Sequence, residues 1–144
     1  MDVDCDGANR SDGKCVNDPT GQGQTAFKDG VAKYGLDDLD SNKHSYIVFG
    51  NQKYSTSFDP TQYGVPELGV VVVVCAGQFF YAVWGDTNGG TLVGEASISL
   101  ATACFGQGMT GNSGHPDTDV LYLVFTGNRA ATNSTVDWYP LTPP

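Results

Sequence analysis

Apolar residues in the middle of the chain occur in short runs bounded by glycine, asparagine and aspartate. The runs span residues 46–49, 70–74, 79–84 and 120–126. Runs of this length between turn residues are typical of β-strands. Ala76-Gly77-Gln78 joins the second run to the third, which predicts a β-hairpin, and the unbroken valines from 70 to 74 predict a strand that is buried on both faces.

Two other segments have the periodicity of short helices. Phe27, Val31 and Tyr34 recur at helical spacing before Gly35, which can end a helix in the left-handed conformation. A second apolar stripe follows Gly94 and stops at Gly106, so it predicts a helix with Glu95 on its first turn. The members of that stripe are Ala96, Leu100, Ala101, Cys104 and Phe105. The first 23 residues carry the turn-forming steps Asp6-Gly7, Asp12-Gly13, Asp18-Pro19 and Thr20-Gly21. They predict an irregular, turn-rich segment.

These elements predict one domain over residues 1–144 that is mainly β with a few short helices, its strands forming a closed or sandwich-like sheet. The chain has 144 residues and 40% hydrophobic content, enough to bury a core. A formal net charge of −9 argues against a nucleic-acid partner and favours a cationic one. The longest apolar run, 70–76, is too short to cross a membrane.

The cysteines and glycosylation sequons indicate an oxidising compartment. The chain has four cysteines and the sequons Asn9-Arg10-Ser11 and Asn133-Ser134-Thr135, which favour a secreted protein whose signal peptide has been removed. A Cys5–Cys15 bridge would staple the first segment. A Cys75–Cys104 bridge would tie the second helix to the sheet, the alternative being two buried thiols. We also expect a monomer.

The sequence predicts neither a resident metal nor a cofactor. Residues 2–7 resemble the opening of a calcium loop, but Gly13 stands at the twelfth position, where a bidentate acid is needed. That favours a structural turn or an extra cationic subsite. Zinc is disfavoured because His44 and His115 are the only histidines and no Cys-x-x-Cys occurs. No nucleophile elbow supports a serine or cysteine triad.

Two carboxylates could carry chemistry together. Glutamate is scarce, since only Glu67 and Glu95 occur, and Glu95 follows a predicted strand that ends at Asp86 by a glycine-rich crossing. Paired carboxylates are what glycoside hydrolysis requires, one to protonate the leaving oxygen and one to activate water. The alternative is structural: Asp86 caps a turn and Glu95 complements a helix N-terminus.

Several strings in order resemble the fungal chitosanases of glycoside hydrolase family 75, over nearly the whole chain. They are Gly21-Gln22-Gly23-Gln24-Thr25-Ala26-Phe27, Tyr46-Ile47-Val48-Phe49-Gly50-Asn51, Val83-Trp84-Gly85-Asp86-Thr87-Asn88-Gly89, Gly94-Glu95-Ala96-Ser97-Ile98-Ser99-Leu100-Ala101 and Asp119-Val120-Leu121-Tyr122. The resemblance implies a compact β-barrel, six-stranded and of the double-psi type. It also implies a secreted enzyme that cleaves β-1,4 links between glucosamine units with inversion, using Asp86 and Glu95.

The resemblance favours Glu95 as the acid and Asp86 as the base, although a place on the first helical turn would favour ionised Glu95 and the base role. Chitosan carries ammonium groups, so acidic side chains are expected to line its subsites. The candidates are Asp37, Asp38, Asp40, Asp117 and Asp119. Trp84 could stack on a sugar at the cleft or fill the core, and weaker stacking candidates are Tyr34, Tyr46, Trp138 and Tyr139.

Other readings remain open beside the resemblance. Relatives carry a signal peptide and a further N-terminal stretch, so this chain resembles a processed or trimmed form. The connection from Asp86 to Glu95 is also brief. A non-hydrolytic glycan-binding or expansin-like wall-loosening module could share the barrel and the cleft without catalytic geometry. Hydrolysis of neutral β-glucans or chitin is disfavoured by the acidic charge.

Overall fold

The structure is a computed structural model that describes residues 1–51, 57–91 and 93–132. Its elements, in chain order, are β1 (Asp2–Asp4), η1 (Gly13–Cys15), α1 (Lys28–Ala32), β2 (Tyr46–Val48), η2 (Pro60–Tyr63), β3 (Val70–Cys75), β4 (Gln78–Asp86), β5 (Glu95–Ser97), α2 (Ile98–Phe105), β6 (Leu121–Val124) and η3 (Asn128–Ala130). The chain is thus mainly β with a few short helices, as predicted. Among the described residues, no helix has the length and apolar character needed to cross a bilayer.

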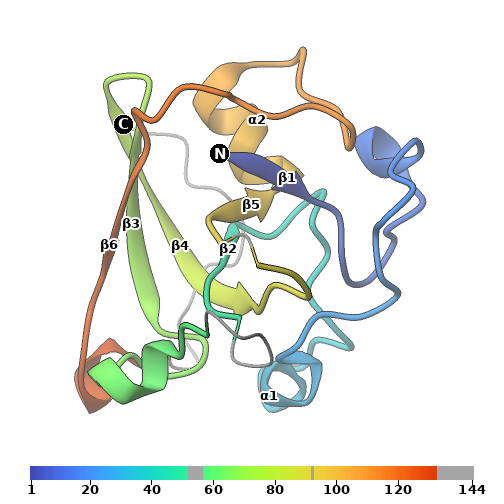
Figure 1. The fold of residues 1–144 in the computed structure, drawn as a ribbon. Helices are drawn as coiled ribbons and strands as arrows, with labels where there is room; N and C mark the ends of the chain where they lie inside the picture. The colour runs from blue at the N-terminus through green and yellow to red at the C-terminus, as the bar shows by residue number, and fades with distance from the viewer. Residues whose placement is uncertain (52–56, 92, 133–144) are drawn as a thin grey trace.

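The six strands form one mixed sheet in the order β1-β5-β2-β4-β3-β6 (Figure 1). The pairs β1–β5 and β2–β4 are parallel, whereas β2–β5, β3–β4 and β3–β6 are antiparallel. The expected closed barrel is not formed in the described part of the chain, because β1 and β6 stand at opposite ends of the sheet. The double-psi topology is therefore not confirmed.

The predicted hairpin is confirmed, but its burial differs from the expectation. Ala76 and Gly77 both have positive φ, 48° and 74°, the combination that a two-residue type I′ turn needs. Residues along β3 alternate between buried and partly exposed, so only the face that carries Val71 and Val73 is fully covered. The valine run therefore reflects a sheet with one covered face, not a strand buried on both.

The second helix begins later than its apolar stripe predicts. Glu95 lies on β5, and α2 starts only at Ile98. Pairing of β5 with both β1 and β2 holds this segment extended, and the Ser97 side chain accepts a hydrogen bond from the Leu100 backbone N–H at 3.4 Å, as an N-cap does. The helix dipole therefore has no direct bearing on the charge of Glu95.

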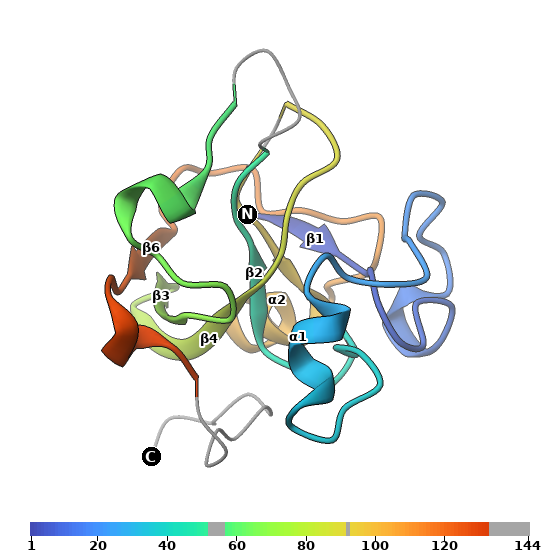
Figure 2. The same cartoon turned by 90° about the horizontal axis from the view of Figure 1, so that it is seen from below.

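The core lies between α2 and one face of the sheet, centred on the fully buried Trp84. Trp84 packs edge-on against Phe27 at 4.9 Å between ring centroids and against Phe49 at 6.5 Å. Both predicted disulfides are present, Cys75–Cys104 and Cys5–Cys15. The first ties the end of β3 to the end of α2, and the second closes the N-terminal loops, which lie on one side of the sheet with α1 (Figure 2).

Candidate active site

Asp86 and Glu95 lie on strands that flank the same residue of β2. Val48 pairs with Asp86 of β4 on one side and with Glu95 of β5 on the other. Paired residues of neighbouring strands point to the same face of a sheet, and two strand spacings separate the two backbones by about 10 Å. The sheet thus presents both carboxylates on one face.

An irregularity in β4 gives Asp86 this orientation. Ile47 pairs with Trp84, but the next residue, Val48, pairs with Asp86, so Gly85 is the extra residue of a bulge. A regular strand would turn Asp86 toward the face of Trp84, because residues two apart in a strand lie on the same face. The bulge instead leaves Trp84 in the core, away from the hollows described below, and turns Asp86 to the opposite face.

Two adjoining hollows of about 350 Å³ and about 270 Å³ meet at this face. Both are lined by Asp86 and Asn88, and the smaller one is also lined by Glu95. Their shared walls are Asp6, Gln22, Asp86, Thr87, Asn88 and Gly89. Because so much of the lining is common, the two hollows form one continuous cleft.

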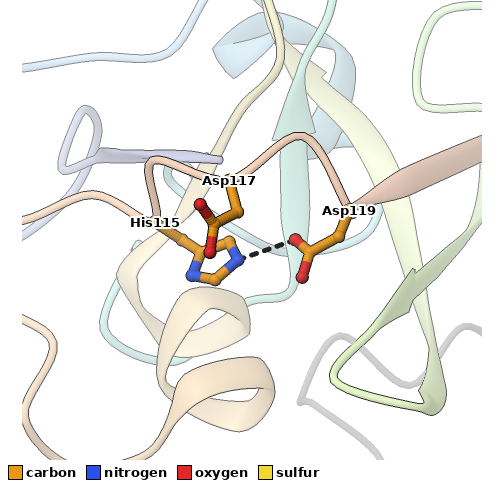
Figure 3. A group of neighbouring side chains, drawn as sticks. All are labelled: His115, Asp117 and Asp119. Carbon is orange, nitrogen blue, oxygen red and sulfur yellow. Dashed lines mark hydrogen bonds and ion pairs between the residues drawn. The ribbon is translucent and has the colours of Figure 1, made fainter.

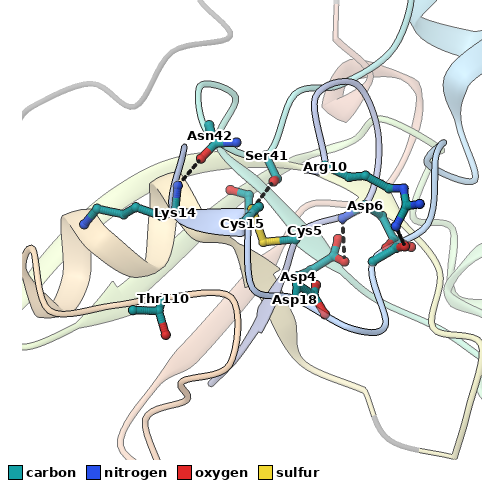
Figure 4. The surroundings of a disulfide bond; sticks show 12 residues. Asp4, Cys5, Asp6, Arg10, Lys14, Cys15, Asp18, Ser41, Asn42 and Thr110 are labelled. Carbon is teal, nitrogen blue, oxygen red and sulfur yellow. Dashed lines mark hydrogen bonds between the residues drawn. A yellow bond between two sulfur atoms is a disulfide. The ribbon is translucent and has the colours of Figure 1, made fainter. Parts of the chain in front are cut away.

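Acidic side chains from the N-terminal segment complete the cleft, and the sequence analysis did not select them. The smaller hollow is lined by Asp4, Asp6 and Asp18 in addition to the two central carboxylates, and no Lys, Arg or His lines it among the described residues. Figure 4 shows these three aspartates around the Cys5–Cys15 disulfide. The Asp-rich opening of the chain was the available signal, and it was interpreted only as a structural turn or an extra cationic subsite.

Burial sets the ionisation of the central pair. Desolvation raises the pKa of Asp86 to about 7, against the opposing effect of backbone hydrogen bonds from Ala26 and Thr87 at 2.8 and 2.7 Å. Desolvation also raises the pKa of Glu95 to about 7, opposed by a hydrogen bond that the Asn88 amide donates to its carboxylate. Near neutral pH the pair can therefore hold one proton, which acid–base catalysis requires.

Tyr122 of β6 fixes the backbone next to Glu95. Its hydroxyl donates to the Gly94 carbonyl at 2.9 Å, where Gly94 adopts a φ of +101° at the entry to β5. Burial raises the pKa of Tyr122 further above its ordinary value, so the hydroxyl stays a donor. The sequence predicted neither this hydrogen bond nor the one from Asn88 to Glu95, because both depend on how the chain folds and not on a local pattern.

Most aspartates predicted to line the subsites lie elsewhere. Asp38 is buried and accepts hydrogen bonds from the Thr25 hydroxyl and backbone N–H at 2.6 and 3.1 Å. Asp40 is buried and bonded to Asn9 and Lys43 at 3.0 and 2.8 Å. Asp37 is exposed after α1. Asp38 and Asp40 therefore hold loops together, and none of the three lines the cleft.

Asp117 and Asp119 gather around His115 on the loop before β6 (Figure 3). His115 Nε2 lies 2.7 Å from Asp119 Oδ1, and the ring stacks on Phe105 at 3.9 Å between centroids. Asp117 lines a separate hollow together with Gly94, the residue before Glu95.

The tyrosines proposed as weaker stacking candidates are bonded within the fold. The Tyr46 hydroxyl donates to the Asp6 carbonyl and the Tyr34 hydroxyl to the Thr132 carbonyl. Trp138 and Tyr139 lie outside the described residues.

The raised pKa values predict that the protein is less stable at alkaline pH. A carboxyl with a raised folded-state pKa stabilises the fold fully below its unfolded pKa, near 4, and loses that contribution as the pH rises through about 7. Burial lowers the pKa of His44, which acts in the opposite direction. The raised carboxyls outnumber it, because burial also raises the pKa values of Asp4 and Asp6. We expect the melting temperature to be roughly 5–10 °C lower at about pH 8 than at about pH 5.

Calorimetry across this pH range tests the prediction. The variant carrying both Asp86→Asn and Glu95→Gln should show a flatter dependence, because it lacks the two titrating groups. A wild-type melting temperature that rises between these pH values would contradict the burial of the pair.

Comparisons with known proteins identify the family of the chain. The model for "fungal chitosanase of glycosyl hydrolase group 75" matches residues 1–140. The chain is 57% identical to endo-chitosanase B of Aspergillus oryzae and 55% to an endo-chitosanase of Aspergillus fumigatus, each over 96% of this chain and 58% of the relative. Endo-chitosanase C of A. oryzae is 35% identical over 93% of this chain and 32% of the relative.

No solved structure matches the chain. The chain spans somewhat more than half the length of the first two of these relatives, 58% of each. The family match nevertheless covers all but the last four residues, including both central carboxylates. The chain therefore belongs to the fungal chitosanases of glycosyl hydrolase group 75.

Proposed function

We propose that this chain provides the catalytic domain of a secreted endo-chitosanase, which hydrolyses β-1,4 linkages between glucosamine units with inversion at the anomeric carbon. The observation that supports it best is the pair Asp86 and Glu95, which flank Val48 in the sheet and line one hollow. Their backbones, about 10 Å apart, leave room for the water that an inverting pair must accommodate. The two disulfides fit a secreted protein.

In the proposed reaction Glu95 is the general acid and Asp86 the general base. Glu95 gives its proton to the glycosidic oxygen as the bond to the anomeric carbon breaks, while Asp86 takes a proton from the water that attacks from the opposite side. Two backbone N–H groups hold one oxygen of Asp86, which favours the ionised form needed by a base. Because Glu95 lies on β5 and not on a helix, no helix dipole opposes its role as the acid.

The charge of the cleft supports a cationic substrate. Five carboxyl groups line the smaller hollow without a Lys, Arg or His among its described lining, and the whole chain carries a formal charge of −9. Ammonium groups along chitosan would offset this charge, whereas neutral glucans or chitin would leave it uncompensated. We assign substrate contacts to Asp6 and Asp18 and, at the neighbouring hollow, to Asp117. The domain would act as a monomer without a cofactor.

The deciding experiment is a reducing-end assay of the chain on soluble chitosan, with NMR detection of the anomer that is released first. We expect endo-cleavage with inversion, little activity on chitin or neutral β-glucans, and a KM that rises with ionic strength through screening. Binding to chitosan without any bond cleavage would support the wall-loosening or glycan-binding alternative. Release of the retained anomer would rule out the inverting mechanism.

A further inference from the structure

Two buried carboxylate oxygens, Asp4 Oδ2 and Asp86 Oδ2, have no hydrogen-bond partner within the described part of the chain. Asp4 is 8% exposed and Asp86 is 3% exposed, so bulk water does not compensate them. Asp4, Asp6 and Asp86 each place a carboxylate oxygen within 4.8 Å of the other two. An unpaired buried polar group is costly, and the two carboxyls that carry these oxygens are neighbours. One hydrogen bond shared between them would satisfy both.

The remaining oxygens of the two carboxyls determine what that bond can be. Asp4 Oδ1 accepts from the Asp6 backbone N–H at 3.1 Å (Figure 4). Asp86 Oδ1 accepts from two backbone N–H groups, those of Ala26 and Thr87. If Asp4 is protonated, its one available donor is at Oδ2, and the acceptor still lacking a donor is Oδ2 of Asp86. The two carboxyls are thus complementary in hydrogen bonding.

The surroundings assign the proton to Asp4. The titratable groups around the cleft near Asp4 are Asp2 on its own strand, Asp6 and Asp18 on the N-terminal loops, Tyr46 of β2, Asp86 of β4 and Glu95 of β5. Burial and then repulsion by Asp6 and Asp86 raise the pKa of Asp4 well above its ordinary value. Arg10 offsets part of the charge of Asp6. Two backbone N–H groups stabilise the ionised form of Asp86 and one stabilises that of Asp4, so Asp4 is the member of the pair that keeps the proton.

We propose that Asp4 is a positioning residue of the active site, whose protonated carboxyl donates from Oδ2 to Oδ2 of Asp86, directly or through one water, and holds Asp86 ionised and oriented. The inference rests on the function proposed above, in which Asp86 is the base. Both oxygens are shielded from solvent, so the contact lies on the buried side of Asp86.

Infrared spectroscopy tests the proton on Asp4 without reference to activity. At about pH 9 the Asp86 and Glu95 carboxyls are ionised. A remaining carbonyl stretch of a protonated carboxylic acid then comes from another buried carboxyl, and its loss on replacement of Asp4 assigns it to Asp4. We expect this band in the wild type and in the control Asp12→Asn, an exposed aspartate outside the cleft, and its loss in Asp4→Asn. A wild-type spectrum without the band overturns the proposal, whether or not the chain cleaves chitosan.

The pH profile of hydrolysis tests the positioning role. Asp4→Asn keeps a neutral donor, so its kcat/KM should stay within about threefold of wild type with an unmoved acidic limb. Asp4→Val removes the donor and should shift that limb upward by about one pH unit, with a fall in kcat of about tenfold. Two results contradict the proposal: an Asp4→Asn variant as impaired as Asp4→Val, or an Asp4→Val variant with an unmoved limb.

The two measurements keep failure of this inference distinct from failure of the proposed function. If Asp4→Val does not fold, as judged by circular dichroism, the infrared band and the Asp4→Asn profile still decide the question. If the wild-type chain does not hydrolyse chitosan, the proposed function fails, while the band still reports whether Asp4 carries the proton.

Discussion

Replacing Glu95 with glutamine is expected to lower kcat on soluble chitosan by about 10²- to 10⁴-fold, the range typical of a lost general acid. Glutamine has the same size and its carbonyl oxygen can still accept the hydrogen bond from the Asn88 amide, so the cleft should keep its shape. Binding of chitosan, measured by calorimetry, should change little. The loss would therefore fall on the chemical step.

The chain offers a matched control for this variant, because only two glutamates occur in it. Glu67 is exposed in the loop before β3 and lines neither hollow of the cleft, so Glu67→Gln should leave kcat unchanged. Asp86→Asn should be impaired to a similar extent as Glu95→Gln, and the double variant should lose much less than the product of the two effects. Near-normal turnover by Glu95→Gln would refute its role as the acid.

Replacing Gly85 with alanine should damage both the fold and the site. A Cβ at this position would lie 2.5 Å from Leu39 Cδ1 and 2.6 Å from Tyr46 Cβ, inside a fully buried cluster. Overpacking of this kind costs about 1–3 kcal/mol. Because Gly85 is the extra residue of the bulge that turns Asp86 toward the cleft, a displacement of even about 1 Å should reduce kcat by about 10²-fold.

Thermal unfolding and initial rates on chitosan measure the two effects of Gly85→Ala separately. Gly108→Ala is the control, since no atom lies within 4 Å of a Cβ built there and its backbone is outside the positive-φ range. That variant should match wild type in both measurements. Wild-type stability and rate in Gly85→Ala would mean that the bulge does not determine the orientation of Asp86.

The sequence predicted what depends on local pattern. Runs of β-branched residues found the hairpin of β3 and β4, and the scarcity of glutamate pointed to Glu95. The sequence did not predict that Glu95 lies on a strand, because Gly-Glu-Ala-Ser continues the helical stripe. Only the pairing of β5 with β1 and β2 keeps this segment extended. Local periodicity carries no information about such distant partners.

The local sequence pattern also could not predict which residues line the cleft. The parity of a regular strand puts Trp84 and Asp86 on one face, and one extra residue at Gly85 separates them. Charge alone likewise cannot distinguish Asp38, which is buried and bonded to Thr25, from Asp6, which lines both hollows. Asp6 reaches the cleft because the N-terminal segment crosses the sheet there. That path is set by the pairing of β1 with β5, which lie more than ninety positions apart in the sequence.

The parallel pairing of β1 with β5 also bears on the order of events during synthesis. β1 contributes Asp4 to the cleft, yet its hydrogen-bond partners in the sheet are residues 95–97. During synthesis, β1 must therefore wait until residues 95–97 have left the ribosome before it finds its partner strand. Contacts of such high sequence separation form slowly, so we expect the nascent chain to acquire the β3–β4 hairpin first and the acidic cleft only after β5 has emerged.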